Sequence, residues 1–312
     1  MDNMNFENQE NPGTRSAFVA LEGKPNAGKS SLLNRLVGEK VAIVTEKPQT
    51  TRTRITGVLT KGEVQLVFID TPGLLKAKDA LGRYMVKQVR DSVADVDLAV
   101  LVTEPGPELS KADADLIENF KKLRLPAIAV VNKVDTLEKK EEMLPKLAAL
   151  AAAYDFREII PISALTGEGV DTLLSILLDS AGEGVHFFPD DALTDQPERV
   201  LCAEMIREKI LIHMREEVPH GVAVVVEEMK DRPAAGEDAP PLVDISAMIY
   251  CEREGHKGMI IGKGGQMLKT IASEARRDME DFLGARVNLQ CRVKTKEAWK
   301  NSEFQLRNFG YR

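Results

Sequence analysis

Short apolar runs alternate with amphipathic stretches through the first half of the chain. The runs typical of buried strands are residues 17–21, 64–69, 128–131 and 159–162. Apolar residues at helical spacing follow the first run, from Leu32 to Val37. This alternation predicts an α/β domain with a mostly parallel sheet, which we place at residues 15–182.

The pattern changes in the second half of the chain. Residues 183–197 are rich in Gly, Pro and Asp and show no periodicity, which predicts a linker. An amphipathic helix is expected over 198–217, and an acidic loop rich in Pro and Ala over 230–241. Strands are expected at 222–227, 242–253 and 286–293. With 312 residues the chain is long enough for two domains, so we expect a second, α+β domain at 198–312.

The turn after the first apolar run matches the pattern of a phosphate-binding loop, Gly-x4-Gly-Lys-[Ser/Thr]. It lies between a predicted strand and a predicted helix, which makes an accidental match less credible. Its glycines allow backbone N–H groups to surround a phosphate chain. Lys29 is expected to bridge the β- and γ-phosphates, and Ser30 to bind Mg²⁺. The expected nucleotide contacts in this loop are Gly23, Lys24, Pro25, Asn26, Ala27, Gly28, Lys29, Ser30 and Ser31.

A second motif, Asn132-Lys133-Val134-Asp135, follows the predicted strand at 128–131. Asp135 can accept hydrogen bonds from the N1–H and 2-amino groups of guanine, a pairing that adenine cannot reproduce. Asn132 would connect this turn to the phosphate loop, and the stem of Lys133 would pack along the purine. Alone, the motif is equally compatible with a polar turn at a strand end. Its place about 100 residues after a phosphate loop favours GTP.

Three further segments predict contacts to Mg²⁺, the γ-phosphate and the base. Asp70 is expected to hold Mg²⁺ through water, and the Gly73 N–H to contact the γ-phosphate. Thr51 is predicted to close over the ion as a switch residue, unless its segment is only a surface loop. Ser163 and its neighbours are expected to contact guanine. The predicted nucleotide contacts outside the phosphate loop are Asp70, Thr71, Pro72, Gly73, Leu74, Asn132, Lys133, Val134, Asp135, Ser163, Ala164 and Leu165.

Four of these motifs occur in the order and strand context of a small GTPase, and within that group the chain resembles the Era family of bacterial GTPases. The resemblance rests on Pro25-Asn26, Gln49-Thr50-Thr51-Arg52 and Asp70-Thr71-Pro72-Gly73-Leu74, and it continues in the C-terminal part. It implies a Ras-like P-loop GTPase domain with GTP or GDP and Mg²⁺ as cofactors. The alternating segments 55–60 and 63–69 would then form the antiparallel hairpin of a mixed sheet.

Leu74 stands where Ras-like switches carry the glutamine that orients the attacking water. Leucine has no donor or acceptor, so we expect slow hydrolysis that depends on positioning and charge neutralisation. The expected catalytic residues are Lys29, Thr51, Gly73 and Asn26. In related GTPases with a hydrophobic residue in place of the glutamine, the matching asparagine helps to hold K⁺. Asn26 therefore either binds K⁺ or only tolerates an unusual backbone angle.

The sequence Ile260-Ile261-Gly262-Lys263-Gly264-Gly265 resembles the KH domain, whose Gly-x-x-Gly loop clamps an RNA backbone. The expected helix-strand-strand-helix-helix-strand order fits its type II form. A second phosphate loop is disfavoured because the spacing from Gly258 is one residue short and Gly264 replaces the Mg²⁺-binding Ser or Thr. A glycine-rich turn without a ligand is the alternative. The expected RNA contacts are Ile261, Gly262, Lys263, Gly264, Gly265, Lys269 and Arg276.

Charge supports an RNA-binding C-terminal part. Residues 250–312 carry 13 Lys and Arg against 8 Asp and Glu, whereas residues 1–249 carry 29 against 41. Cys202, Cys251 and Cys291 are too far apart for a local zinc site and favour a reducing cytoplasm. No apolar run approaches the ~20 residues that span a bilayer.

The resulting hypothesis is a GTP-dependent switch that binds single-stranded RNA. The resemblance implies that the RNA is the 3′ end of small-subunit (16S) rRNA and that the protein assists 30S subunit maturation. Peripheral association with the inner face of the cell membrane has also been linked to the family. We expect a monomer and no DNA partner. The alternatives are a GTPase gate in a tRNA-modification complex and a membrane or cell-cycle regulator whose KH fold binds protein.

Overall fold

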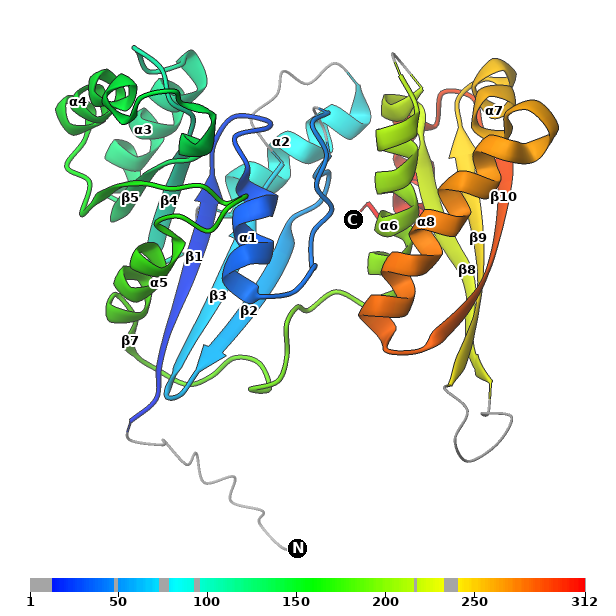
Figure 1. Ribbon diagram of the computed structural model, residues 1–312, viewed down its shortest axis with the longest axis horizontal. Helices are drawn as coiled ribbons and strands as arrows, with labels where there is room; N and C mark the ends of the chain where they lie inside the picture. The colour runs from blue at the N-terminus through cyan, green and yellow to red at the C-terminus, as the bar shows by residue number, and fades with distance from the viewer. Residues whose placement is uncertain are drawn as a thin grey trace, which may run out of the picture.

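A computed structural model describes residues 13–47, 50–72, 79–92, 96–215, 218–232 and 241–311. They form two units, each a sheet covered by helices, that lie side by side (Figure 1). The strands of the first unit are β1 (Arg15–Glu22), β2 (Ile55–Lys61), β3 (Val64–Asp70), β4 (Leu98–Thr103), β5 (Ala127–Val131), β6 (Ile159–Pro161) and β7 (Gly182–Glu183). Its helices are α1 (Lys29–Val37), α2 (Ala80–Ser92), α3 (Lys111–Leu123), α4 (Leu144–Ala153) and α5 (Val170–Asp179).

The first sheet has the strand order β2-β3-β1-β4-β5-β6, and β7 pairs with β1. Its pairs are parallel except β2 with β3 and β7 with β1. The predicted Ras-like mixed sheet and its hairpin are therefore confirmed. Because parallel strands end at one edge, the segments after β1, β3, β4, β5 and β6 meet there, and the predicted nucleotide motifs follow four of these strands.

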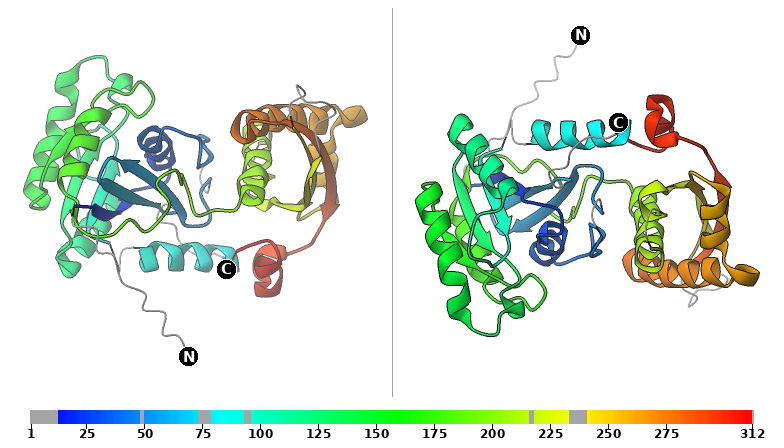
Figure 2. Two further views of the ribbon diagram at one scale, coloured as in Figure 1. Left: turned by 90° about the horizontal axis from the view of Figure 1, so that it is seen from below. Right: turned by 90° about the horizontal axis from the view of Figure 1, so that it is seen from above.

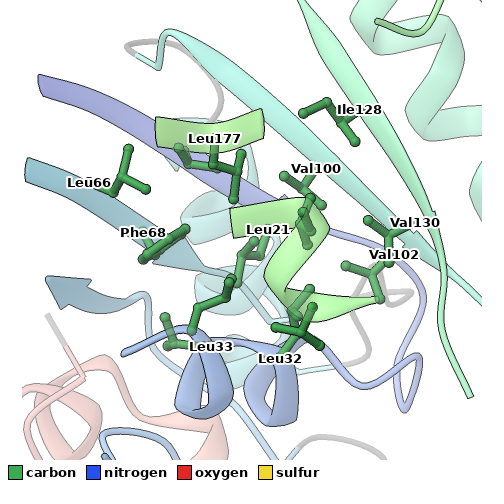
Figure 3. Packing of buried hydrophobic residues seen from close by; sticks show 14 of the residues in the cluster. Leu21, Leu32, Leu33, Leu66, Phe68, Val100, Val102, Ile128, Val130 and Leu177 are labelled. Atoms are coloured by element: carbon green, nitrogen blue, oxygen red, sulfur yellow. The ribbon is translucent and has the colours of Figure 1, made fainter. Parts of the chain in front are cut away.

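Helices bury both faces of this sheet. On one face, Leu32 and Leu33 of α1 and Leu177 of α5 pack against side chains of β1, β3, β4 and β5, such as Phe68 and Val100 (Figure 3). On the other, residues of α3 and α4 such as Phe120 pack against the alternate positions of β4 and β5. Strands buried on both faces have continuous apolar runs, which is why the sequence identified β1, β3 and β5. The equally apolar run of β4 was not among the predicted strands.

The second unit contains α6 (Glu198–His213), β8 (Ala223–Arg232), β9 (Leu242–Cys251), α7 (Glu254–Ile261), α8 (Gln266–Leu283) and β10 (Arg286–Thr295). The strand order is β10-β9-β8, with β9 antiparallel to β8 and parallel to β10. The element order confirms the type II KH arrangement. Helices α6 and α8 cover one face of the sheet (Figure 1). Ile206, Ile249 and Ile271 belong to the core between these helices and the sheet.

Several predicted boundaries in this unit were wrong. Helix α6 ends at His213, because Met214 has an extended backbone. Strand β8 continues through Arg232 into the predicted acidic loop, of which 233–240 lie outside the described residues. Its last residues are charged and give no apolar signal, but they pair with β9 as far as Leu242. Strand β9 ends at Cys251, just before α7.

The predicted linker lies along the edge of the first sheet. The side chain of Gln65 in β3 accepts hydrogen bonds from the N–H groups of Phe187 and Phe188 and donates to the Phe188 carbonyl. The Val58 N–H donates to the Leu193 carbonyl over 2.8 Å. These bonds involve mainly the backbone of the segment, which explains why its sequence shows no periodic pattern.

None of the helices within the described ranges is long and apolar enough to cross a membrane.

Candidate nucleotide and RNA sites

The phosphate loop turns from the end of β1 into the start of α1. Gly28 precedes α1 with φ +97°, and a Cβ there would overlap Nδ2 of Asn132. A Cβ at Gly23 would overlap the Val102 carbonyl of β4. Both positions therefore require glycine, because the loop packs closely against the ends of β4 and β5.

Lys29 lies buried within the curve of this loop. Its Nζ donates to the carbonyls of Gly23 and Lys24, each over 3.1 Å. Burial lowers the pKa of Lys29, although the carboxylates of Asp70 and Glu22 oppose this effect. An ammonium held in this way faces the inside of the loop, where the predicted phosphate chain would lie.

Ser30, Thr51 and Asp70 come together from three different segments. Ser30 Oγ donates to Asp70 Oδ2 over 2.5 Å and lies 2.9 Å from Thr51 Oγ1. Thr51 Oγ1 lies 3.5 Å from Asp70 Oδ2. The other oxygen, Asp70 Oδ1, is buried without a hydrogen-bond partner among the described residues, and burial raises the pKa of Asp70.

This trio fits Mg²⁺. Two hydroxyls and a carboxylate are hard oxygen ligands, and the unpartnered Asp70 oxygen needs a cation or a donor beside it. The described part of the chain contains no group of three or more His, Cys, Asp or Glu side chains that could hold a metal ion. The remaining ligands of an ion here would come from water and phosphate.

The predicted base-binding residues form one network with the phosphate loop. Asn132 Nδ2 donates to the Ala27 carbonyl over 2.8 Å, and its Oδ1 accepts from the Ala164 N–H over 2.9 Å. Ser163 Oγ donates to Asp135 Oδ1 over 2.5 Å and so orients that carboxylate. A cavity of about 1670 Å³ extends from this network past the phosphate loop to Leu211 of α6.

Sequence reasoning missed three residues at this site. Glu104, directly after β4, forms ion pairs with Lys24 of the phosphate loop and Lys133 of the base motif. Partial burial raises its pKa, but the bonds from Lys133 and Lys24 outweigh this effect and hold the pKa of Glu104 below its usual range. Arg35 of α1 donates to the Ala164 and Leu165 carbonyls. In the sequence, only the position of Glu104 at the end of a strand could have indicated that it belongs to the site.

A third missed residue, Glu22, lies beneath the phosphate loop. It is only 1 % exposed, its Oε2 accepts from Thr71 Oγ1 over 3.2 Å, and its Oε1 has no partner within the described ranges. Burial raises the pKa of Glu22 to about 8, although Lys29 opposes this effect. The sequence signal was a carboxylate at the end of an apolar strand.

Glu22 predicts a pH-dependent stability. Its folded pKa lies above its ordinary value of 4.5, so its stabilising contribution is full below pH 4.5 and is lost as the pH rises towards 8. Glu22→Gln should remove this dependence. Between pH 6 and 8.5, the free energy of unfolding of the nucleotide-free wild type should fall by on the order of 3 kcal/mol relative to the variant.

Urea unfolding at both pH values measures this difference. Glu142→Gln, at an exposed position, is the control and should follow the wild type. A parallel pH dependence of wild type and Glu22→Gln would contradict the raised pKa.

Gly73 and Leu74, predicted to act on the γ-phosphate and to replace the catalytic glutamine, lie outside the described residues. Pro72 is buried next to them, and Thr71 is buried against Glu22.

The predicted RNA-binding loop joins α7 to α8. Gly262 has φ +73°, and a Cβ there would lie 2.6 Å from the Met267 Cβ. Gly264 and Gly265 also have positive φ, and Lys263 and Lys269 are exposed beside them. This geometry leaves the backbone of the loop accessible, so that the backbone of a predicted RNA ligand could approach it closely.

Arg276 is less well placed for RNA than the two lysines. It lies 11 residues after Gly265, about 16 Å along the helix axis, and its guanidinium pairs with Glu280 over 2.6 Å. Ile261 is half-buried at the end of α7.

Comparison with known proteins gives matches to both units. Residues 18–133 match the family model described as a 50S ribosome-binding GTPase, and residues 217–300 match that of the KH domain. GTPase Era of Clostridioides difficile is 47% identical over 297 residues, covering 95% of this chain and 98% of that protein. GTPase Era of Ruminiclostridium cellulolyticum is 45% identical over 298 residues, covering 96% of this chain and 98% of that protein.

Two solved structures match nearly the whole chain. One is a variant of Aquifex aeolicus Era bound to GDP·AlF4⁻, and the other is Era in complex with MgGDPNP and nucleotides 1506–1542 of 16S ribosomal RNA. Each has a TM-score of 0.89 and 38% sequence identity, and covers 96% of this chain and 99% of the other.

Proposed function

Because this chain belongs to the Era family of GTPases, we propose that its two sites form a switch in which GTP hydrolysis controls RNA binding. We assign the GTPase domain to residues 15–182, the connecting segment to 183–197 and the KH domain to 198–312. The observation that carries the proposal is the meeting of Ser30, Thr51 and Asp70 beside the phosphate loop. Two of these residues come from segments whose positions change with the nucleotide in switch GTPases.

The residues take the following proposed roles. Lys29 and the loop N–H groups bind the phosphates, and Ser30 and Thr51 bind Mg²⁺, with Asp70 acting through water. Mg²⁺, when bound, neutralises charge on the phosphates. Asp135, oriented by Ser163, recognises guanine. The Gly73 N–H contacts the γ-phosphate.

The proposed RNA is the 3′ end of 16S rRNA, with 30S subunit maturation as the setting. Support comes from the relative solved with nucleotides 1506–1542 and from the open Gly262–Gly265 loop. We propose that Lys263 and Lys269 neutralise phosphates of this RNA, with a smaller contribution from Arg276. The protein would act as a cytoplasmic monomer, and any contact with the inner membrane face would be peripheral.

RNA affinity in the two nucleotide states tests the switch. Dissociation constants for a 16S 3′-end fragment should differ by at least about fivefold between the forms with GDP and with a non-hydrolysable GTP analogue. Equal affinities would contradict the switch. Crosslinking and sequencing of bound RNA separates the alternatives: tRNA fragments would favour the modification gate, and no enriched RNA would favour a protein-binding regulator.

We also propose that Asn26 helps to bind K⁺ near the phosphates. It has φ +65°, and its Nδ2 donates to the Glu46 carbonyl over 2.6 Å, so it has both an unusual backbone angle and a side chain directed at the segment before Thr51. Replacing Na⁺ by K⁺ should raise the GTP hydrolysis rate about tenfold, because the cation would stabilise charge in the transition state.

Asn26→Gly distinguishes the two roles of Asn26. Glycine keeps the left-handed backbone and removes the amide, so K⁺ stimulation should disappear. Stimulation that persists in this variant would leave Asn26 only the backbone role.

A further inference from the structure

The two residues on either side of Thr51 are both held by the C-terminal half of the chain. The Thr50 carbonyl accepts a hydrogen bond from Arg207 of α6, whose side chain is 1 % exposed and also pairs with Glu204. Arg52 is 2 % exposed and donates to the carbonyls of Val222 and His220. The predicted Mg²⁺ ligand thus lies between two anchors in the KH domain.

Arg52 has further partners near the C-terminus. It donates to Tyr311 Oη over 3.2 Å, and its guanidinium carbon lies 5.9 Å from the centroid of the Trp299 ring. Trp299 is fully buried and donates to the Gly221 carbonyl over 3.0 Å. A buried guanidinium is costly unless such acceptors and ring faces are placed around it, so this position is specific for arginine.

The same C-terminal residues contact helix α2, which follows the Asp70–Gly73 motif. Leu81 and Met85 of α2 form one buried cluster with Trp299, Leu306 and Tyr311. Both views in Figure 2 show α2 lying beside the C-terminal segment, at the junction of the two domains. The segment from η5 (Trp299–Asn301) through α9 (Glu303–Asn308) to Tyr311 therefore touches the elements on both sides of the proposed Mg²⁺ site.

We propose that Arg52 is a positioning residue for GTP hydrolysis. Held by the KH domain and the C-terminal segment, it places Thr51 against Ser30 and Asp70, so that the Mg²⁺ site is complete only while these parts are docked. This inference rests on the proposed role of Thr51 as a Mg²⁺ ligand. A role for Arg52 in domain packing alone would stabilise the fold without changing the requirement for Mg²⁺.

Arg52→Lys, Tyr311→Phe and Thr51→Ala test this role in the full-length protein, with Arg54→Lys as the control. Lysine keeps the charge but cannot reach several acceptors at once. Arg54 is exposed two residues further along the same segment. In Arg52→Lys, the Mg²⁺ concentration for half-maximal hydrolysis should rise about tenfold and kcat should fall about tenfold. The KM for GTP should stay within about twofold, because the base and phosphate-loop contacts are unchanged.

Tyr311→Phe removes one acceptor of Arg52. It should raise the Mg²⁺ concentration for half-maximal hydrolysis about threefold and lower kcat about threefold. Arg54→Lys should match the wild type. A wild-type Mg²⁺ requirement and kcat in Arg52→Lys, with only a lower Tm, would overturn the inference.

Trp299 supplies a readout that does not depend on turnover, because it is the only tryptophan in the chain. Adding Mg²⁺ with a non-hydrolysable GTP analogue should change its fluorescence in the wild type and in Arg54→Lys, but not in Arg52→Lys. A wild-type response in Arg52→Lys would count against the inference.

Thr51→Ala distinguishes a failure of the role of Arg52 from a failure of the proposed role of Thr51. An unchanged Mg²⁺ requirement in Thr51→Ala would overturn the proposed role of Thr51 itself. A raised requirement in Thr51→Ala beside a normal Arg52→Lys would overturn only the role of Arg52.

Discussion

Asp135→Asn is expected to lower the affinity for GTP by roughly a thousandfold. Guanine presents the N1–H and 2-amino donors to this carboxylate, and a charged acceptor makes stronger hydrogen bonds than a neutral one. An amide would place its own NH₂ group against one of these donors. A loss of about 4 kcal/mol of binding free energy corresponds to the expected thousandfold rise in the Kd for GTP.

The same substitution should improve the binding of xanthosine triphosphate. Xanthine carries an oxygen in place of the 2-amino group, and the new amide N–H can donate to it. Ser163 Oγ, which donates to Asp135 Oδ1, can donate equally to the amide oxygen, so the side chain should keep its orientation. Competition titrations with GTP, XTP and ATP measure the change of preference.

Asp155→Asn is the matched control, because it removes the same charge at an exposed position outside the site. It should leave the affinities for GTP and XTP unchanged. If Asp135→Asn bound GTP within a few-fold of the wild type, Asp135 would not be the residue that recognises guanine.

The sequence predicted those parts of the site that are built from short contiguous motifs. Gly23–Ser30 and Asn132–Asp135 each follow an apolar strand, and the rule that ligands bind at the carboxyl edge of a parallel sheet places them together. The contact from Asn132 to the phosphate loop follows from the same rule. In the second domain, the two glycines and the order of the elements were sufficient to identify the KH fold.

The residues that connect separate segments could not be predicted. Glu104 joins Lys24 to Lys133, but its sequence context is only that of a polar residue after a strand. Arg52 is separated from Tyr311 by 259 positions, and in the sequence it is one of two arginines in a polar segment. Nothing local distinguishes it from Arg54, although one is buried and the other exposed. Such partners depend on how the two domains dock, which hydrophobic periodicity does not encode.

The contacts of the connecting segment could not be predicted from the sequence either. A stretch rich in Gly, Pro and Asp indicates irregular backbone, and residues 184–197 contain no helix or strand. The sequence did not indicate that Gln65, a polar residue in a buried strand, would fix this segment by three hydrogen bonds. A buried glutamine needs partners for its amide, and here the backbone of the segment supplies them.

Gly262→Ala is expected to weaken RNA binding by about thirtyfold while leaving GTP hydrolysis without RNA unchanged. Gly262 has φ +73°, and the added Cβ would lie 2.6 Å from the Cβ and 3.0 Å from the N of Met267. Both contacts are too close, so the loop between α7 and α8 must move away from the start of α8. A displaced loop would lose about 2 kcal/mol of its interaction with the RNA backbone, which corresponds to the expected change in Kd.

Gly284→Ala provides a control for an alanine at a positive φ elsewhere in the same domain. Gly284 ends α8 with φ +60°, and a Cβ there meets nothing within 4 Å. Gly284 has left-handed helical backbone angles, which cost an alanine about 1–2 kcal/mol of stability. Gly262 combines φ +73° with ψ 176°, a region essentially restricted to glycine, so Gly262→Ala carries more backbone strain and also displaces the loop. Binding of a 16S 3′-end RNA, measured at one fixed salt concentration, should therefore be impaired in Gly262→Ala and normal in Gly284→Ala. Equal losses in both variants would mean that general destabilisation of the KH domain, and not the geometry of the loop, controls RNA affinity.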